Sequence, residues 1–274
     1  MNSQIFNVDC ITSKANSTIV KIGKLQNKKD RKEEKLFTLD GVKLFLEACK
    51  FGAKIKYVIL KDDVDFNSEI VEKINELKRK NTLVICVNEV VFSKLTEENA
   101  PQGIITVCEF LENHSYSIGL KNFCENEKII MLESLRDPGN LGAILRNAAA
   151  FGIDRLVLSS DCVDIYSQKV LRSAMGAVFK VKIDVVPSLV NAIEELKQLG
   201  RRVVSTTLRD NSIRLGKGVV LPSDVFVIGN EGHGVSDEVI FASDETMFIP
   251  MCENTESLNA SVAAAILMWE LFNL

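Results

Sequence analysis

Short apolar runs alternate with helix-like stretches throughout the second half of this chain. The apolar runs lie near residues 129–132, 155–158, 181–186, 202–205, 225–228 and 247–249. Helical patterns fill the intervals, near residues 141–151, 168–175, 189–199, 237–241 and 259–272. A strand that is a continuous apolar run is typical of a parallel sheet with helices on both faces. The alternation therefore predicts an α/β domain built on a parallel sheet.

The first half of the chain has a smaller α/β pattern. A helical stretch at 42–51 precedes strand-like runs at 57–60 and 83–87, and a turn at 101–103 leads into a run at 104–107. Residues 111–127 are polar and aperiodic, which favours a domain boundary near residue 115. The sequence thus predicts a basic arm and helix over 1–35, a small α/β domain over 36–115, and the parallel-sheet domain over 116–274.

Charge is unevenly distributed along the chain. Residues 1–61 carry 13 Lys and Arg against 6 Asp and Glu, although the whole chain has a net charge of −4. A basic segment on an acidic body suits a polyanionic partner, but a solvated lysine-rich face would have the same composition. The hydrophobic and charged fractions, 46% and 26%, are those of a globular protein and exclude a disordered chain or a coiled coil.

Several classes of protein are disfavoured by what the sequence lacks. No apolar run is long enough to cross a bilayer, and the first residues form no apolar signal segment, so we expect a cytoplasmic protein with no membrane partner. The seven cysteines are scattered without the close pairs of a zinc site or a redox dithiol. Their odd number also argues against a disulfide framework. We therefore expect no metal site.

Three polar stretches follow predicted strands. They are DPGNLGAILR at 137–146, GNEGHG at 229–234 and SLN at 257–259. α/β enzymes place their chemistry beyond the carboxyl ends of the strands, so we expect the three stretches to form one site.

The first stretch combines a turn with an arginine. Pro138 and Gly139 indicate a sharp turn, and Asn140 is placed to cap the following helix. Arg146 lies six residues later, about one and two-thirds helical turns, but its side chain could fold back toward the strand ends. There its guanidinium would suit a phosphate. Alternatively, Asn140 is only a cap and Arg146 a surface cation.

The other two stretches offer main-chain and side-chain polar groups. The glycine-rich loop at 229–234 exposes backbone groups that suit an adenine or a ribose, although a plain turn has the same composition. Glu231 could form an ion pair with Arg146 or accept from a ribose hydroxyl. His233 could be a general base or an incidental exposed residue. Ser257 and Asn259 stand where the terminal helix begins, a position suited to binding and to capping.

Together these stretches resemble the three ordered motifs of the SpoU/TrmH family of RNA ribose 2′-O-methyltransferases. The likeness rests on Asn140, Gly142 and Arg146, on the loop at 229–232, and on 249–251 with 257–259, and it covers about residues 128–274. The first half resembles, more loosely, the substrate-binding domain of members that act on large-subunit ribosomal RNA, through residues 13–17, 21–35, 37–41 and 101–104. Asp40 stands where those members usually have Glu.

The resemblance implies an S-adenosyl-L-methionine-dependent enzyme that releases S-adenosyl-L-homocysteine, forms a homodimer, and has a deep trefoil knot in its C-terminal domain. The implied donor site comprises Thr206, Thr207, Gly229, Asn230, Glu231, Gly232, Ile249, Met251, Leu258 and Asn259. The implied catalytic group comprises Asn140, Arg146, Glu231, Ser257 and Asn259, with Arg146 essential.

The implied reaction requires a ribose hydroxyl to lose its proton as it attacks the methyl group. The family proposal makes Arg146 the base, but arginine essentially never deprotonates in proteins, so we favour a role in gripping phosphate and stabilising the forming alkoxide. The expected substrate is large-subunit ribosomal RNA. Alternatives are a transfer RNA 2′-O-methyltransferase, a non-catalytic RNA-binding protein of the same fold, and a dinucleotide-dependent oxidoreductase, which lacks its third glycine.

Overall fold

The computed structural model describes residues 1–116, 124, 126–252 and 257–274, and the chain divides into two compact units. Unit 1 comprises Met1–Leu111 and Asp164–Phe179, and unit 2 comprises Glu112–Val163 and Lys180–Leu274. The first division lies slightly before the boundary expected near residue 115. The segment Asp164–Phe179 was expected in the C-terminal domain, but it packs with unit 1. No helix in the described ranges has both the length and the apolar character needed to cross a membrane.

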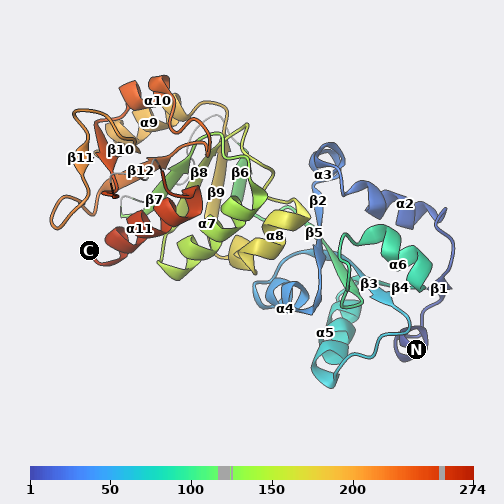
Figure 1. The fold of residues 1–274 in the computed structure, drawn as a ribbon. Helices are drawn as coiled ribbons and strands as arrows, with labels where there is room; N and C mark the ends of the chain where they lie inside the picture. Colours follow the sequence, from blue (N-terminus) through green and yellow to red (C-terminus); the bar gives the residue numbers. More distant parts are fainter. Residues whose placement is uncertain (117–123, 125, 253–256) are drawn as a thin grey trace. The chain divides into compact units, whose positions relative to one another are not determined.

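Unit 1 is built on a mixed sheet (Figure 1). Across the sheet, the described strands follow the order β1 (Cys10–Ile11), β4 (Leu83–Val87), β3 (Ile55–Lys61), β5 (Ile104–Glu109) and β2 (Leu36–Asp40). Strands β1 and β3 run parallel to β4, whereas β5 is antiparallel to both β3 and β2.

Helices cover both faces of this sheet. Ile59 of β3 joins one apolar cluster, while its neighbours Val58 and Leu60 join another, because alternate strand residues point to opposite faces. The cluster around Ile59 includes residues of α2 (Ser17–Lys24) and α6 (Glu89–Leu95). The other cluster includes residues of α1 (Asn2–Phe6), α4 (Val42–Lys50) and α5 (Ser68–Arg79).

The first residues do not form the arm expected from the sequence. Asn2 is buried, and its Nδ2 donates to the carbonyl oxygens of Lys61 and Val64, both at 2.7 Å. Strand β1 pairs with β4, and the α2 helix contributes Ile19 to the core. The expected exposed helix is α3 (Lys28–Glu34), of which Arg31 is the one buried residue. The basic segment is therefore an integral part of unit 1.

The segment Asp164–Phe179 contains α8 (Gln168–Ala174) and the 3-10 turn η1 (Ala177–Phe179). Tyr166 is fully buried and stacks on Phe37 and Phe110, with ring centroids 4.4 and 4.2 Å away. Asp164 accepts from Nε of the buried Arg31 at 2.9 Å. Stacking and a buried ion pair thus hold this segment in unit 1.

Unit 2 is built on a sheet in which every described strand pair is parallel, as predicted (Figure 1). The order of the described strands is β11 (Ile213–Arg214), β13 (Glu245–Phe248), β10 (Arg202–Thr206), β12 (Asp224–Ile228), β7 (Ile129–Leu132), β8 (Arg155–Ser159), β9 (Lys182–Val186) and β6 (His114–Tyr116). The six predicted runs correspond to strands, although β13 begins two residues earlier than expected. The edge strands β6 and β11 were not predicted because they are short and partly polar.

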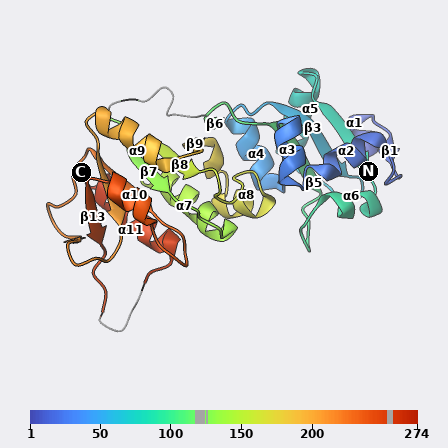
Figure 2. The ribbon, with the colours of Figure 1, turned by 90° about the horizontal axis from the view of Figure 1, so that it is seen from above.

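Helices also cover both faces of the parallel sheet. Ile129 and Met131 of β7 lie in an apolar cluster with residues of α9 (Leu189–Gln198) and α10 (Asp237–Ala242). The equally buried Ile130 and Leu132 point to the opposite face. On that side α7 (Pro138–Ala150) and α11 (Ala260–Phe272) pack against each other, as Figure 2 shows from above. The predicted two-sided α/β architecture is confirmed.

Candidate functional site

The first polar stretch begins helix α7, but with a different N-cap from the one predicted. Asp137 is the N-cap, and its Oδ1 accepts from the backbone N–H of Asn140 at 2.8 Å. Pro138 and Gly139 are the first helical residues rather than a separate turn, because proline is favoured at a position where no helical N–H is needed. Asn140 is therefore not the cap. Its side chain is available for other contacts.

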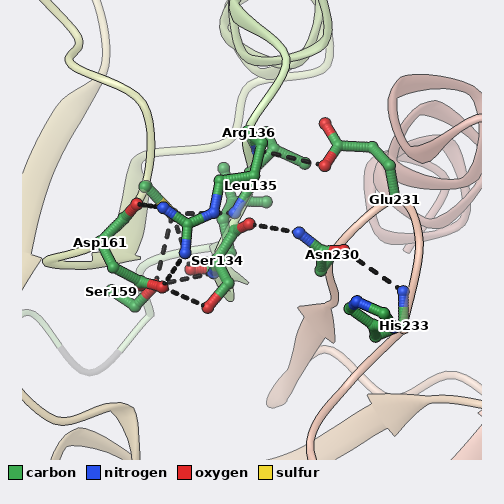
Figure 3. Close-up of polar contacts among 10 residues, drawn as sticks. Ser134, Leu135, Arg136, Ser159, Asp161, Asn230, Glu231 and His233 are labelled. Carbon is green, nitrogen blue, oxygen red and sulfur yellow. Dashed lines mark hydrogen bonds and ion pairs between the residues drawn. The ribbon is translucent and has the colours of Figure 1, made fainter.

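Glu231, in the loop after β12, links the second stretch to the first. One carboxylate oxygen accepts from the backbone N–H of Asp137 and from Nδ2 of Asn140, both at 3.0 Å. The other accepts from the backbone N–H of Arg136 at 3.1 Å (Figure 3). Burial raises the pKa of Glu231, but these hydrogen bonds outweigh it and hold the pKa below its usual range. Of the two roles suggested for Glu231, the ion pair with Arg146 is not formed.

Asn259 joins the third stretch to the first. Its Oδ1 caps α11 by accepting from the backbone N–H of Ser261 at 2.9 Å. Its Nδ2 donates to Oδ1 of Asn140 at 2.9 Å. A chain of hydrogen bonds therefore runs from Asn259 through Asn140 to Glu231, and it connects all three polar stretches.

These contacts border an open hollow of about 450 Å³. Its walls combine carboxylates, amides, a hydroxyl and a guanidinium, from Arg136, Asp137, Asn140, Glu231, Ser257, Leu258, Asn259 and Ala260. Such a lining suits a polar ligand that offers hydrogen-bond donors and acceptors. Among the described residues, no cluster of His, Cys, Asp or Glu is arranged to hold a metal ion.

The glycine-rich loop closes tightly on itself. Asn230 and Gly234 exchange two backbone hydrogen bonds of 2.9 Å, and Oδ1 of Asn230 accepts from the backbone N–H of Gly232 at 2.8 Å. Nδ2 of Asn230 donates to the carbonyl oxygen of Ser134 at 2.7 Å (Figure 3). A Cβ on Gly229 would lie only 2.1 Å from the backbone carbon of Gly234. The loop shape thus requires Gly229, and the Asn230 side chain is used to maintain it.

A network of hydrogen bonds and an ion pair at the ends of β7 and β8 was not predicted from the sequence. Arg136 forms an ion pair with Asp161 at 2.7 Å, and Asp161 also accepts from Ser134 and Ser159, both at 2.6 Å (Figure 3). Burial raises the pKa of Asp161, but these partners outweigh it and lower the pKa overall. The signal was present, because Ser134 follows β7 and Ser159 ends β8, and these two strands are adjacent and parallel.

Thr206 ends β10, and Thr207 follows it. Oγ1 of Thr206 donates to the carbonyl oxygen of Val227 at 2.8 Å. The backbone N–H of Thr207 donates to the carbonyl oxygen of Met247 at 3.0 Å. Ile249, Met251 and Leu258 are partly buried, and Leu258 lines the hollow. His233 is exposed.

Arg146 is not brought to the hollow. Its side chain is exposed on α7, and it makes no hydrogen bond or ion pair with the residues that the structure describes. The side chain does not fold back onto the polar stretches of its own chain.

Two protein-family models and a curated protein match this chain. The SpoU rRNA Methylase family matches residues 127–269, and the MRM3-like substrate binding domain matches residues 16–106. The chain is 31% identical to the 23S rRNA (guanosine(2553)-2′-O)-methyltransferase RlmP of Bacillus subtilis, over 95% of this chain and 98% of that protein.

Solved structures also resemble this one. An rRNA methyltransferase from Sinorhizobium meliloti has a TM-score of 0.83 at 28% identity, covering 97% of each chain. An AdoMet-bound structure of an rRNA methyltransferase from the same organism has a TM-score of 0.81 at 27% identity, again over 97% of each chain.

Proposed function

The chain belongs to the SpoU rRNA methylase family, and we propose from this that its substrate is large-subunit ribosomal RNA. It is an enzyme that uses S-adenosyl-L-methionine to methylate a ribose 2′-hydroxyl of RNA. The observation that carries the proposal is the chain of hydrogen bonds from Asn259 through Asn140 to Glu231, which assembles the three polar stretches into one site. The matching substrate-binding domain at residues 16–106 supports a ribosomal target.

The proposed donor site is the side of this centre formed by the glycine-rich loop and the ends of β10 and β13. When bound, S-adenosyl-L-methionine supplies an electrophilic methyl group. The closed loop, shaped by Gly229 and Asn230, fits such a ligand because it fixes the backbone groups of residues 229–232 before binding. Thr206, Thr207, Ile249, Met251, Leu258 and Asn259 complete the proposed site.

The proposed nucleotide site uses Asn140, Ser257 and Arg146. Glu231 has a lowered pKa and accepts from two backbone N–H groups and an amide, so its role is to hold Asn140 and the start of α7 in place. Asn140 and Ser257 then orient the ribose for in-line attack. Arg146 would stabilise the forming alkoxide and grip phosphate.

Transfer of labelled methyl from S-adenosyl-L-methionine to unmodified large-subunit rRNA tests this function. We expect incorporation at a linkage that resists alkaline cleavage, since a methylated 2′-oxygen cannot attack the adjacent phosphate. Unmodified transfer RNA is assayed in parallel. Transfer only to transfer RNA would contradict the ribosomal assignment, and donor binding without transfer to either RNA would favour a non-catalytic RNA-binding protein.

We also propose that the protein is a cytoplasmic homodimer that pairs through α7 and α11. Helix α11 is apolar on nearly every side, with Glu270 as its one charged residue, which is unusual for a helix with one side open to solvent. Its outer side exposes Val262, Trp269 and Phe272 by 46, 50 and 50%, and Phe151 lies beside Trp269. With Asn147 of α7, this face borders an apolar groove of about 330 Å³. A second copy would cover this face.

In the proposed dimer, Arg146 lies next to the interface. Arg146 adjoins Asn147, which lines the apolar groove, and it has no partner among the described residues of its own chain. A catalytic role for Arg146 then requires movement of its side chain or a contact across the dimer.

We further propose the trefoil knot of this family. Its support is the family likeness.

Replacing Trp269 with glutamate should convert the dimer to a monomer, because the charge would be buried without a partner at the interface. Sedimentation at micromolar concentration would measure the change in mass. Phe241→Glu is the matched control, since Phe241 is 79% exposed on α10, away from the groove. A wild-type monomer, or a Trp269→Glu variant that remains dimeric, would contradict this interface.

A further inference from the structure

Arg136 is the one positively charged side chain among the described residues that line the hollow. Two carboxylates, Asp137 and Glu231, share the same walls. Glu231 is ionised at neutral pH, because its hydrogen bonds lower its pKa. An RNA phosphate entering this hollow therefore needs a cation there to offset the repulsion. Arg146 does not line the hollow and is not placed to provide that charge in its own chain.

The guanidinium of Arg136 is held in a defined orientation while remaining accessible. Nη1 donates to the carbonyl oxygen of Asp161 and Nη2 to its Oδ2, both at 2.7 Å (Figure 3). Asp161 is fixed in turn by the hydroxyls of Ser134 and Ser159. The Arg136 side chain is nevertheless 62% exposed. Only part of its set of N–H donors is used by Asp161, so the others can face a ligand.

The geometry points to Arg136 as a phosphate-binding residue of the RNA nucleotide site, with Asp161 as its positioning residue. This assignment rests on the proposed function and adds a residue outside the three family motifs. Arginine suits phosphate because its planar fork of donors matches two phosphate oxygens. By holding two of the guanidinium nitrogens, Asp161 keeps Arg136 from turning onto Glu231 or Asp137. Asp161 itself does not touch the RNA.

Arg136→Ala should raise the KM for RNA by roughly tenfold to hundredfold, the usual range for loss of a charged contact. The dissociation constant for S-adenosyl-L-methionine should not change, because the variant keeps the backbone N–H of residue 136, which donates to Glu231. The decisive readout is the dependence of RNA binding on salt. Loss of one phosphate contact should reduce the slope of log K against log salt concentration by about 0.7–0.9.

Companion variants separate phosphate binding from a structural role. Arg136→Lys keeps the charge, so it should keep the salt slope while raising KM less than alanine does. Asp161→Asn should also keep the slope but raise KM, because the arginine is retained and less well oriented. Lys197→Ala is the matched control. Lys197 lies on α9, outside the hollow, and like Arg136 it forms an ion pair, with Asp244 at 3.1 Å. The Lys197→Ala variant should change neither KM nor the slope.

The salt slope is measured by RNA binding without catalysis, so this inference and the proposed reaction are tested separately. Absence of methyl transfer by the wild type would refute the reaction, and the binding slope would still report on Arg136. An unchanged slope for Arg136→Ala would overturn the phosphate contact. If Arg136→Ala kept the wild-type salt slope but had a lower melting temperature and a lower donor affinity, Arg136 would have a structural role instead.

Discussion

Replacing Gly229 with alanine is expected to weaken donor binding roughly tenfold to hundredfold. The new Cβ would lie 2.1 Å from the backbone carbon of Gly234 and 2.2 Å from the backbone nitrogen of Val235. Neither backbone atom can move without breaking the paired hydrogen bonds between Asn230 and Gly234. Overpacking of this kind costs about 1–3 kcal/mol, and 1.4 kcal/mol corresponds to about tenfold in affinity.

Calorimetric titration with S-adenosyl-L-methionine would measure this loss, and thermal unfolding would report the effect on the fold. Gly216 provides the matched control, because a Cβ there would meet nothing within 4 Å. The Gly216→Ala variant should bind the donor as the wild type does. Wild-type affinity in Gly229→Ala would show that the loop does not form the donor site.

Arg146→Ala should lower kcat by about 10²–10³, the usual loss when one group that stabilises developing negative charge is removed. The fold should be unaffected, because the side chain is exposed and makes no hydrogen bond or ion pair with the described residues. Donor affinity should also be unchanged, since Arg146 does not line the hollow. Single-turnover methyl transfer to rRNA measures the chemical step directly.

Arg214→Ala is the matched control for this variant, because Arg214 is exposed on β11 of the same unit. It should retain full activity. Arg146→Lys distinguishes two roles. Activity retained with a new basic limb in the pH–rate profile would favour Arg146 as the base. A large loss of activity at every pH would favour positioning by the guanidinium. Full activity of Arg146→Ala would exclude both roles.

The parallel sheet was predictable because its central strands are buried on both faces. Residues 129–132 and 225–228 are apolar without interruption, and the structure places them side by side in the sheet. The edge strand β6, His-Ser-Tyr, has no such signal, since its residues are only partly buried. Strand β1, of two residues, is likewise too short to have a recognisable period.

At the site, the sequence predicted which segments meet but not how their side chains pair. Asn140 was expected to cap α7, but Pro138 at the first helical position makes Asp137 the cap. The N-cap therefore lies about one helical turn before the predicted position. The Asn140 amide is then free to hydrogen-bond with Glu231 and Asn259. Arg136 and Asp161 were missed because they lie outside the three polar stretches, and only the pairing of β7 with β8 brings them together.

The return of residues 164–179 to unit 1 affects the order in which a nascent chain can fold. When residue 111 has been synthesised, Phe37 and Phe110 still lack Tyr166, which stacks between them, and the buried Arg31 lacks Asp164. The ribosome adds roughly 5–20 residues per second, so several seconds pass before those partners exist. Unit 1 therefore cannot finish folding before residues 164–179 have been synthesised. Its completion waits for a part of the chain that is synthesised after the first strands of unit 2.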